Sequence, residues 1–118
     1  MKEETKLQNK ITSCLDYLIK SKHAPIIYEK RVNRGFAYKK GSPDLWLAIC
    51  GTHIEIELKV NDNERTPLQI KWEKRCRERH CPYWLLYSFE EFMFYLKKIL
   101  SFEGYEKILQ NLPENFNI

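Results

Sequence analysis

Apolar residues recur along this chain with two different periods, and each period predicts a different element. Across residues 2–22 they recur every three or four positions, which predicts an amphipathic helix with one buried face. The residues of that face are Leu7, Ile11, Cys14, Leu15 and Leu18. The run His23-Ala24-Pro25 ends this helix, and residues 26–32 follow as a predicted strand with a turn at residues 33–35.

A β-hairpin is predicted in the middle of the chain. Residues 45–49 are an apolar run, residues 52–60 alternate, and Cys50-Gly51-Thr52 separates them. Because side chains alternate between the two faces of a strand, Ile54, Ile56 and Leu58 share one face of the second strand. The opposite face carries His53, Glu55, Glu57 and Lys59. The apolar face needs a core, and the charged face is either solvated or used.

The second half of the chain contains two sequence patterns that predict the start of a helix. Thr66-Pro67-Leu68-Gln69 has Thr at the N-cap, Pro at the first helical position and Gln where a capping box needs it. The apolar residues of this helix that we expect to pack inward are Leu68, Trp72 and Cys76. The run Ser88-Phe89-Glu90-Glu91 repeats the capping pattern and opens a helix that extends to about residue 100.

The remaining segments complete the predicted order of elements. Cys81-Pro82 ends the helix before residues 83–87, which read as a short buried strand, and a further short helix is expected at residues 105–111 before a loose end. The apolar stripe of the helix up to residue 100 is wide, so it forms either one deep core face or a core face plus a dimer surface.

A single α/β domain accounts for this order: a mixed central sheet flanked by helices. The chain has 118 residues, of which 43% are hydrophobic, and a domain of this size buries roughly two-thirds of its unfolded surface. We expect residues 1–118 to form one domain, with a core at about 2–100 and a C-terminal helix and tail at 101–118.

The hairpin predicts a cluster of charged groups. Antiparallel pairing brings the start of the first strand beside the end of the second, so Asp44 should lie near Glu57 and Lys59. Carboxylate oxygens are the ligands that Mg²⁺ and Mn²⁺ prefer, and such an ion can polarise a phosphoryl group. A lysine beside it can orient the nucleophile or hold the phosphate. The alternative is a solvated hairpin face with an incidental salt bridge.

At these residues the sequence resembles a known family. Pro43-Asp44 followed by Glu57-Leu58-Lys59 is similar to the PD-(D/E)xK nuclease signature. The wider string, GSPDL, then IEIELK, then Gln69 with Trp72 three residues on, resembles the VRR nuclease branch of that superfamily, over most of residues 2–87. The resemblance implies a restriction-endonuclease-like sandwich and a Mg²⁺- or Mn²⁺-dependent DNA endonuclease without an organic cofactor.

The resemblance also implies roles for individual residues. A glutamate of the first helix completes the metal-site acids in the family; Glu4 fits the register best, and Glu3 is the fallback, although acids in a first helical turn are also favoured by the helix dipole. The backbone carbonyl of Leu58 would complete the metal shell. Gln69 would lie near the acidic centre, a role that is compatible with its capping box. Glu55, on the same face, is the reserve candidate.

Basic residues flank the predicted site. The chain has 20 Lys and Arg against 16 Asp and Glu, a net charge of +4. The candidate DNA-binding residues are Lys30, Arg31, Arg34, Lys39 and Lys40 before the hairpin, and Lys71 and Arg75 after it. Their alternative role is a soluble surface.

Further expectations concern partners and location. Small stand-alone members of the resembled family, typically phage-encoded, are homodimers that cut branched DNA such as four-way junctions. A charged N-terminus and the lack of an apolar run of about 20 residues predict no membrane span and a cytoplasmic protein, in the host cell if it is phage-encoded. Four scattered cysteines predict no disulfide framework. Two other functions stay open: a non-catalytic nucleic-acid-binding module of the same fold, and a protein-interaction domain.

Overall fold

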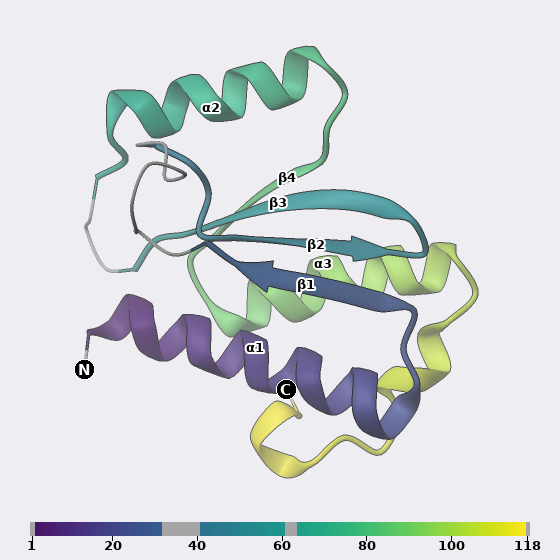
Figure 1. Ribbon diagram of the computed structural model, residues 1–118. Helices are drawn as coiled ribbons and strands as arrows, with labels where there is room; N and C mark the ends of the chain where they lie inside the picture. Colours follow the sequence, from purple (N-terminus) through teal and green to yellow (C-terminus); the bar gives the residue numbers. More distant parts are fainter. Residues whose placement is uncertain (1, 32–40, 61–63, 118) are drawn as a thin grey trace.

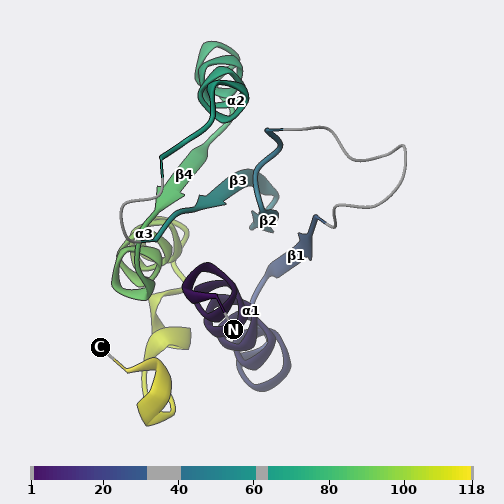
Figure 2. The same cartoon turned by 90° about the vertical axis from the view of Figure 1, so that its left-hand side faces the viewer.

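A four-stranded sheet organises the chain in the computed structural model, which describes residues 2–31, 41–60 and 64–117 (Figure 1). The elements are α1 (Glu3–Lys22), β1 (Ile26–Lys30), β2 (Leu45–Ile49), β3 (Thr52–Leu58), α2 (Pro67–Glu78), β4 (Tyr83–Leu86) and α3 (Phe89–Phe102). Helix α2 lies on one side of the sheet, and α1 and α3 lie on the other (Figure 2). The predicted mixed sheet flanked by helices is confirmed.

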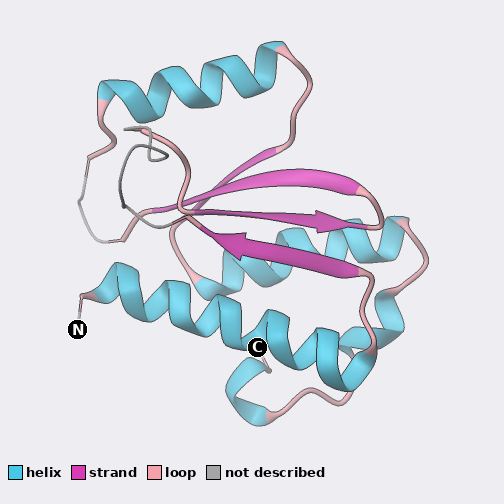
Figure 3. Ribbon diagram, in the orientation of Figure 1, coloured by secondary structure: helices cyan, strands magenta, loops and turns pink. Residues whose placement is uncertain are grey.

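The strands stand in the order β1-β2-β3-β4. The pairs β1–β2 and β2–β3 are antiparallel, whereas β3 and β4 are parallel. A parallel neighbour requires a crossover, and α2 supplies it on the side of the sheet opposite α1 and α3 (Figure 3). The crossover places α2 over the charged face of β3, where the candidate site lies.

The β2–β3 hairpin closes through a two-residue turn. Ile49 pairs with Thr52, and the residues between them, Cys50 and Gly51, have φ angles of 50° and 86°. Two successive positive φ values define a type I′ turn, whose twist matches that of the flanking strands. The turn fixes the register, so it also fixes which side chains of β3 face α2.

The hydrophobic core lies between the sheet and the α1/α3 layer. Side chains at alternate positions of β2 and β3 point into it, as the pattern predicted. These are Leu45, Leu47, Ile49, Ile54, Ile56 and Leu58, each no more than 1% exposed. The predicted face of α1 and the buried residues of α3 cover them from below. Burial of six such side chains contributes on the order of 10 kcal/mol in favour of folding, before conformational entropy is counted.

The predicted capping box is complete in α2, whereas in α3 only the bond to the N-cap side chain forms. In α2 the backbone N–H of Gln69 donates to Thr66 Oγ1 at 3.2 Å, and the N–H of Thr66 donates to Gln69 Oε1 at 2.8 Å. In α3 the N–H of Glu91 donates to Ser88 Oγ at 3.2 Å. Glu91 in turn accepts from the N–H of Tyr87, one residue before the N-cap, at 2.7 Å. These bonds satisfy backbone donors that a helix leaves open at its start.

Helix α2 corrects part of the predicted packing. Cys76 is buried as expected, but Leu68 is 48% exposed and Trp72 is only half-buried. The reason is that α2 packs against β4 over a small area, so it lacks a broad apolar surface to cover. The first turn of α2 instead meets the backbone at Gly41.

The C-terminal segment also differs from expectation. A single helix at residues 105–111 was predicted, but two short 3₁₀ helices form, Glu106–Leu109 and Glu114–Phe116. The predicted loose end is wrong, because Phe116 is buried with its ring centroid 6.0 Å from that of Tyr17 and 6.3 Å from that of Phe89. This packing joins the tail to both α1 and α3.

Two predicted absences can be compared with the described residues. The four cysteines are free thiols, and Cys14 and Cys76 are buried. None of the described helices combines the length and the apolar character that crossing a membrane requires.

Substitution of Gly41 tests the contact between the segment before β2 and the start of α2. A Cβ at Gly41 would lie 2.6 Å from Leu68 Cβ and 2.7 Å from the Leu68 carbonyl carbon, and φ is 85°. Gly104 also has a positive φ, 84°, which is unfavourable for any residue other than glycine, but nothing lies within 4 Å of a Cβ added there. We expect Gly104→Ala to lower the free energy of unfolding by about 1–2 kcal/mol. Gly41→Ala should cost at least about 1 kcal/mol more in urea denaturation; equal losses would contradict the contact.

Candidate nuclease site

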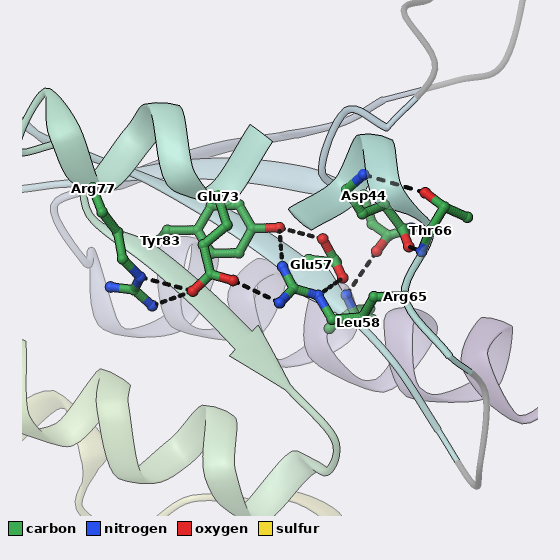
Figure 4. Close-up of polar contacts among 9 residues, drawn as sticks. Asp44, Glu57, Leu58, Arg65, Thr66, Glu73, Arg77 and Tyr83 are labelled. Carbon is green, nitrogen blue, oxygen red and sulfur yellow. Dashed lines mark hydrogen bonds and ion pairs between the residues drawn. The ribbon is translucent and has the colours of Figure 1, made fainter. Parts of the chain in front are cut away.

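Asp44 lies immediately before β2, beside the end of β3. Leu45 pairs with Ile56, so Asp44 meets the residues that follow Ile56. Asp44 Oδ2 accepts a 2.7 Å hydrogen bond from the N–H of Leu58 (Figure 4). On the other side, the N–H of Arg31 donates to the Asp44 carbonyl at 2.9 Å. Backbone contacts on both sides therefore position this carboxylate, and the predicted approach of Asp44 to the end of β3 is confirmed.

The electrostatic surroundings of Asp44 are unfavourable for its charge. Burial raises its pKa from 3.8 to about 6. The hydrogen bond from Leu58 lowers the pKa, and the positive charge of Lys59 also lowers it, whereas the negative charges of Glu4 and Glu57 raise it. Three carboxylates and one ammonium group thus act on each other here, and the acids prevail.

Of the two acids in the first turn of α1, Glu4 acts electrostatically on Asp44. Glu4 is half-buried, and its charge acts on Asp44. Glu3 is exposed and forms an ion pair with Lys6 at 3.1 Å, one turn along α1. The structure therefore places the preferred candidate at the site and the fallback on the surface.

Glu57 is fully buried, with both carboxylate oxygens engaged. Arg65 Nε donates to Glu57 Oε2 at 3.0 Å, and the hydroxyl of Tyr83 donates to Glu57 Oε1 (Figure 4). Burial and the hydrogen bond to Glu57 raise the pKa of Tyr83, so its hydroxyl stays a neutral donor. A carboxylate without exposed surface needs such partners, because an unpaired buried charge is costly.

The same network reaches α2. Arg65 Nη1 lies 2.6 Å from Glu73 Oε1, and Arg77 Nε donates to Glu73 Oε2 at 2.7 Å. Arg65 thus bridges an acid of β3 and an acid of α2, and its side chain is 17% exposed. These ion pairs hold the end of β3 to α2 and to the segment that precedes it.

Lys59 and Gln69 differ in how their side chains are engaged. The side chain of Lys59 is largely buried, and its backbone N–H donates to the Leu86 carbonyl at 2.9 Å. Within the described part of the chain no ion pair of 4 Å or less engages its ammonium group. The side chain of Gln69 serves the capping box, and the helix turn that carries it contacts Gly41, three residues before Asp44.

The candidate DNA-binding residues divide into three groups. Arg31 is bound to Glu55 through two contacts, at 2.5 and 3.0 Å, and to the Pro43 carbonyl at 3.2 Å, so it connects the segment before Asp44 to β3. Lys30, Lys71 and Arg75 are exposed. The predictions for Arg34, Lys39 and Lys40, like that for Val32 in β1, lie outside the described residues.

Several residues of the site were not singled out by the sequence. Arg65 and Tyr83 carry no functional role in the sequence prediction, whereas Glu55 was the reserve candidate for the acidic site. Glu55 instead accepts hydrogen bonds from Arg31 and from the His53 ring. The available signal was the run of charged residues on one face of β3: beneath a crossover helix, such acids require cationic partners.

The donor atoms present fit a hard divalent cation. Asp44 and Glu57 offer carboxylate oxygens, and Glu4 is a third acid nearby. The N–H and C=O of one strand residue point the same way, so the Leu58 carbonyl also faces Asp44. The described residues contain no group of three His, Cys, Asp or Glu side chains gathered as a metal site. Two carboxylates, a carbonyl and waters match the oxygen shell that Mg²⁺ accepts, and the excess negative charge around Asp44 favours a cation.

Comparison with known proteins identifies the fold. A scan against models of protein families and a search of curated proteins found no match. Among solved structures, a chain described as a VRR_NUC domain superposes with a TM-score of 0.52 and 19% identity, over 78% of this chain and 95% of that one. This chain has the fold of a VRR_NUC domain, in agreement with the resemblance of its motifs.

Replacement of Arg65 tests the buried network. Arg65→Gln leaves Glu57 buried without a cation, so we expect the free energy of unfolding to fall by about 3–5 kcal/mol. Arg77→Gln is the matched control, because Arg77 pairs with Glu73 at the exposed end of the same network and should cost no more than about 0.5 kcal/mol. Urea denaturation measures both, and equal effects would contradict the role given to Arg65.

Replacement of Asp44 tests its electrostatic strain. Because folding raises the pKa of Asp44 from 3.8 to about 6, the ionised group destabilises the metal-free protein increasingly as pH rises from about 4 to about 6. At pH 7 with chelator present, Asp44→Asn should therefore have a higher free energy of unfolding than wild type, as measured by urea denaturation. The gain should be at most about 3 kcal/mol, at ~1.4 kcal/mol per pKa unit. The two proteins should converge near pH 4. If Asp44→Asn is less stable than wild type at pH 7, the ionised Asp44 does not destabilise the protein, and the prediction is wrong.

Proposed function

We propose that this protein is a metal-dependent DNA endonuclease of the VRR nuclease type, which hydrolyses phosphodiester bonds. The observation that carries the proposal is the convergence of Asp44, Glu57 and Lys59 at the paired ends of β2 and β3, where the charge of Glu4 from α1 also acts on Asp44. A fold shared with a VRR_NUC domain supports it. Acids crowded together against their own repulsion are characteristic of functional sites rather than of structural ones.

Each residue has a task in this proposal. Asp44, Glu57 and the Leu58 carbonyl would hold Mg²⁺ or Mn²⁺, with Glu4 contributing directly or through a water. When bound, the ion supplies Lewis-acid polarisation of the phosphate and an acidified water. Lys59 positions the nucleophile or stabilises the charge that develops on the phosphate, since its ammonium lies close enough to lower the pKa of Asp44.

Arg65 and Tyr83 are positioning residues in this arrangement. They keep the Glu57 carboxylate in one orientation, and each carboxylate oxygen retains a further lone pair beyond the bond it accepts. Gln69 caps α2 beside the segment that leads to Asp44. From this place it contributes to the positioning of substrate near the helix N-terminus, where anions bind well.

The same two contacts favour a second candidate. Because Arg65 and Tyr83 already satisfy Glu57, the acid does not need a metal ion to remain buried. A non-catalytic nucleic-acid-binding module of this fold would retain the exposed cations Lys30, Lys71 and Arg75 and would bind DNA without cutting it. Catalysis is the preferred function because Asp44 lacks a comparable cationic partner among the described residues.

The substrate and assembly follow from the resemblance. We propose branched DNA, such as a four-way junction, as the substrate and a homodimer as the active form. Exposed aromatic side chains on α3 support a self-association surface, among them Phe94 at 55% and Phe102 at 87% exposed. A small domain that reads DNA shape rather than bases is consistent with this substrate.

A cleavage assay tests the catalytic proposal. End-labelled four-way junction, linear duplex and single strand are incubated with the purified protein and Mg²⁺, Mn²⁺ or chelator. We expect metal-dependent cutting of the junction, lowered at least about 100-fold by Asp44→Asn or Lys59→Ala. Unimpaired cleavage by either variant contradicts the assigned site.

Glu4→Gln and Glu3→Gln form a matched pair in the same assay. Glu4→Gln should slow cutting about 10-fold or more, whereas Glu3→Gln should leave it unchanged, because Glu3 pairs with Lys6 on the surface. Binding of the junction without any cutting, in every metal tested, would transfer the conclusion to the non-catalytic module.

A further inference from the structure

A cleft opens between α2 and the charged face of β3, next to the candidate site. Its volume is about 520 Å³, within the range of pockets that hold small organic groups. The lining residues are Glu55, Trp72, Arg75, Cys76, Arg79 and Cys81. None of them was assigned to the proposed metal centre.

The α2 wall of the cleft combines one aromatic ring with two cations. Trp72, Arg75 and Arg79 follow one another at intervals of three and four residues, so they project from the same face of the helix. Among the described residues, Arg75 has no ion pair. Arg79 uses Nη1 to donate to the Arg75 carbonyl at 3.3 Å, and the same nitrogen lies 3.9 Å from the exposed Glu78. Both guanidinium groups are therefore available to an anion.

The opposite wall does not repel an anion. The Glu55 carboxylate is buried and is bound by both terminal nitrogens of Arg31 and by the ring of His53. Next to it on the same sheet face, the ring of Trp46 stacks on that of His53, with centroids 5.1 Å apart. With the charge of Glu55 balanced by Arg31, the cleft carries the net positive charge of Arg75 and Arg79.

The position of the cleft relates it to the cutting site. Glu55 and Glu57 are two residues apart on β3 and face the same way, which separates their Cα atoms by roughly 7 Å along the strand. A DNA strand with its reacting phosphate at Asp44 and Glu57 therefore has a neighbouring nucleotide within reach of the cleft.

We propose that this cleft binds one unpaired nucleotide adjacent to the scissile phosphate, with its base stacked on Trp72 and its phosphate held by Arg75 and Arg79. The inference rests on the proposed nuclease function and adds that one nucleotide beside the cut is unpaired in the complex, as a nucleotide at the branch point of a junction or a flap can be. A base that remains paired in a duplex cannot enter a cleft walled by α2 and β3. Aromatic stacking combined with cations is the usual means of binding single strands without reading their sequence.

Binding measurements test the cleft separately from catalysis. In an Asp44→Asn background with chelator, fluorescence anisotropy gives Kd for a blunt duplex and for the same duplex carrying an oligothymidine flap. We expect the flap to bind more tightly than the duplex. Trp72→Leu should weaken flap binding about 5- to 100-fold, as expected for loss of one stacked base, and should change duplex binding less than about twofold.

Conservative and control variants separate stacking from folding. Trp72→Phe keeps an aromatic ring and should retain most of the flap affinity. Ile70→Ala, an exposed apolar residue of α2 outside the cleft, should have no effect. Arg75→Ala should reduce the slope of log K against log salt for flap DNA by about 0.7, and Lys97→Ala, on α3, should not.

The outcomes distinguish the two proposals. If Trp72→Leu, folded by circular dichroism, binds the flap as tightly as its parent, the nucleotide cleft is disproved while the nuclease proposal stands. A parent protein that binds neither these two probes nor the four-way junction, at any salt concentration, disproves both proposals. Selective loss of flap binding in Trp72→Leu, restored in Trp72→Phe, establishes the cleft.

Discussion

The burial of the Glu57 carboxylate is the constraint on which the position of α2 against the sheet depends. A charge without exposed surface must be paired, and Arg65 and Tyr83 provide the partners. Because Arg65 also binds Glu73, the pairing connects β3, the segment before α2, α2 itself and β4. Cys76 is the buried residue of α2, so little hydrophobic contact would otherwise hold this helix on the sheet. The position of α2 therefore depends on directional polar contacts.

The two faces of the sheet divide stability from chemistry. Against α1 and α3 the central strands present mainly apolar side chains, whose burial is non-directional and supplies most of the folding free energy. Toward α2 they present charged and aromatic groups with defined partners. One strand, β3, serves both faces by simple alternation, so the hairpin turn at Cys50 and Gly51 that fixes its register also aligns the site. Because the apolar face stabilises the fold, the polar face can contain charged groups that do not contribute to stability.

The acids of the site differ in how their charge is compensated. The charge of Glu57 is compensated by Arg65, whereas burial and the negative charges of Glu4 and Glu57 raise the pKa of Asp44 to about 6. Among the described residues, the cation that opposes this rise is Lys59. Charge left without a partner is the usual cost of a functional site, since a ligand is meant to complete it. In the proposed enzyme the missing partner is a cation at Asp44, and the adjacent cleft, with its own surplus of positive charge, complements the DNA strand that the cation would engage.

The sequence by itself determined the elements whose signals are local. Periods and spacings within a few residues predicted the buried face of α1, the β2–β3 hairpin, the N-caps of α2 and α3, and the approach of Asp44 to the end of β3. These are confirmed. Only the tertiary structure decided the pairing of Arg65 with Glu57 and of Arg31 with Glu55, the exposure of Leu68, the burial of Phe116 and the cleft beside Trp72. The physical reason is that a charge or a ring finds its partner across elements distant in sequence, and the distance between those elements is set by how the whole sheet and its helices pack.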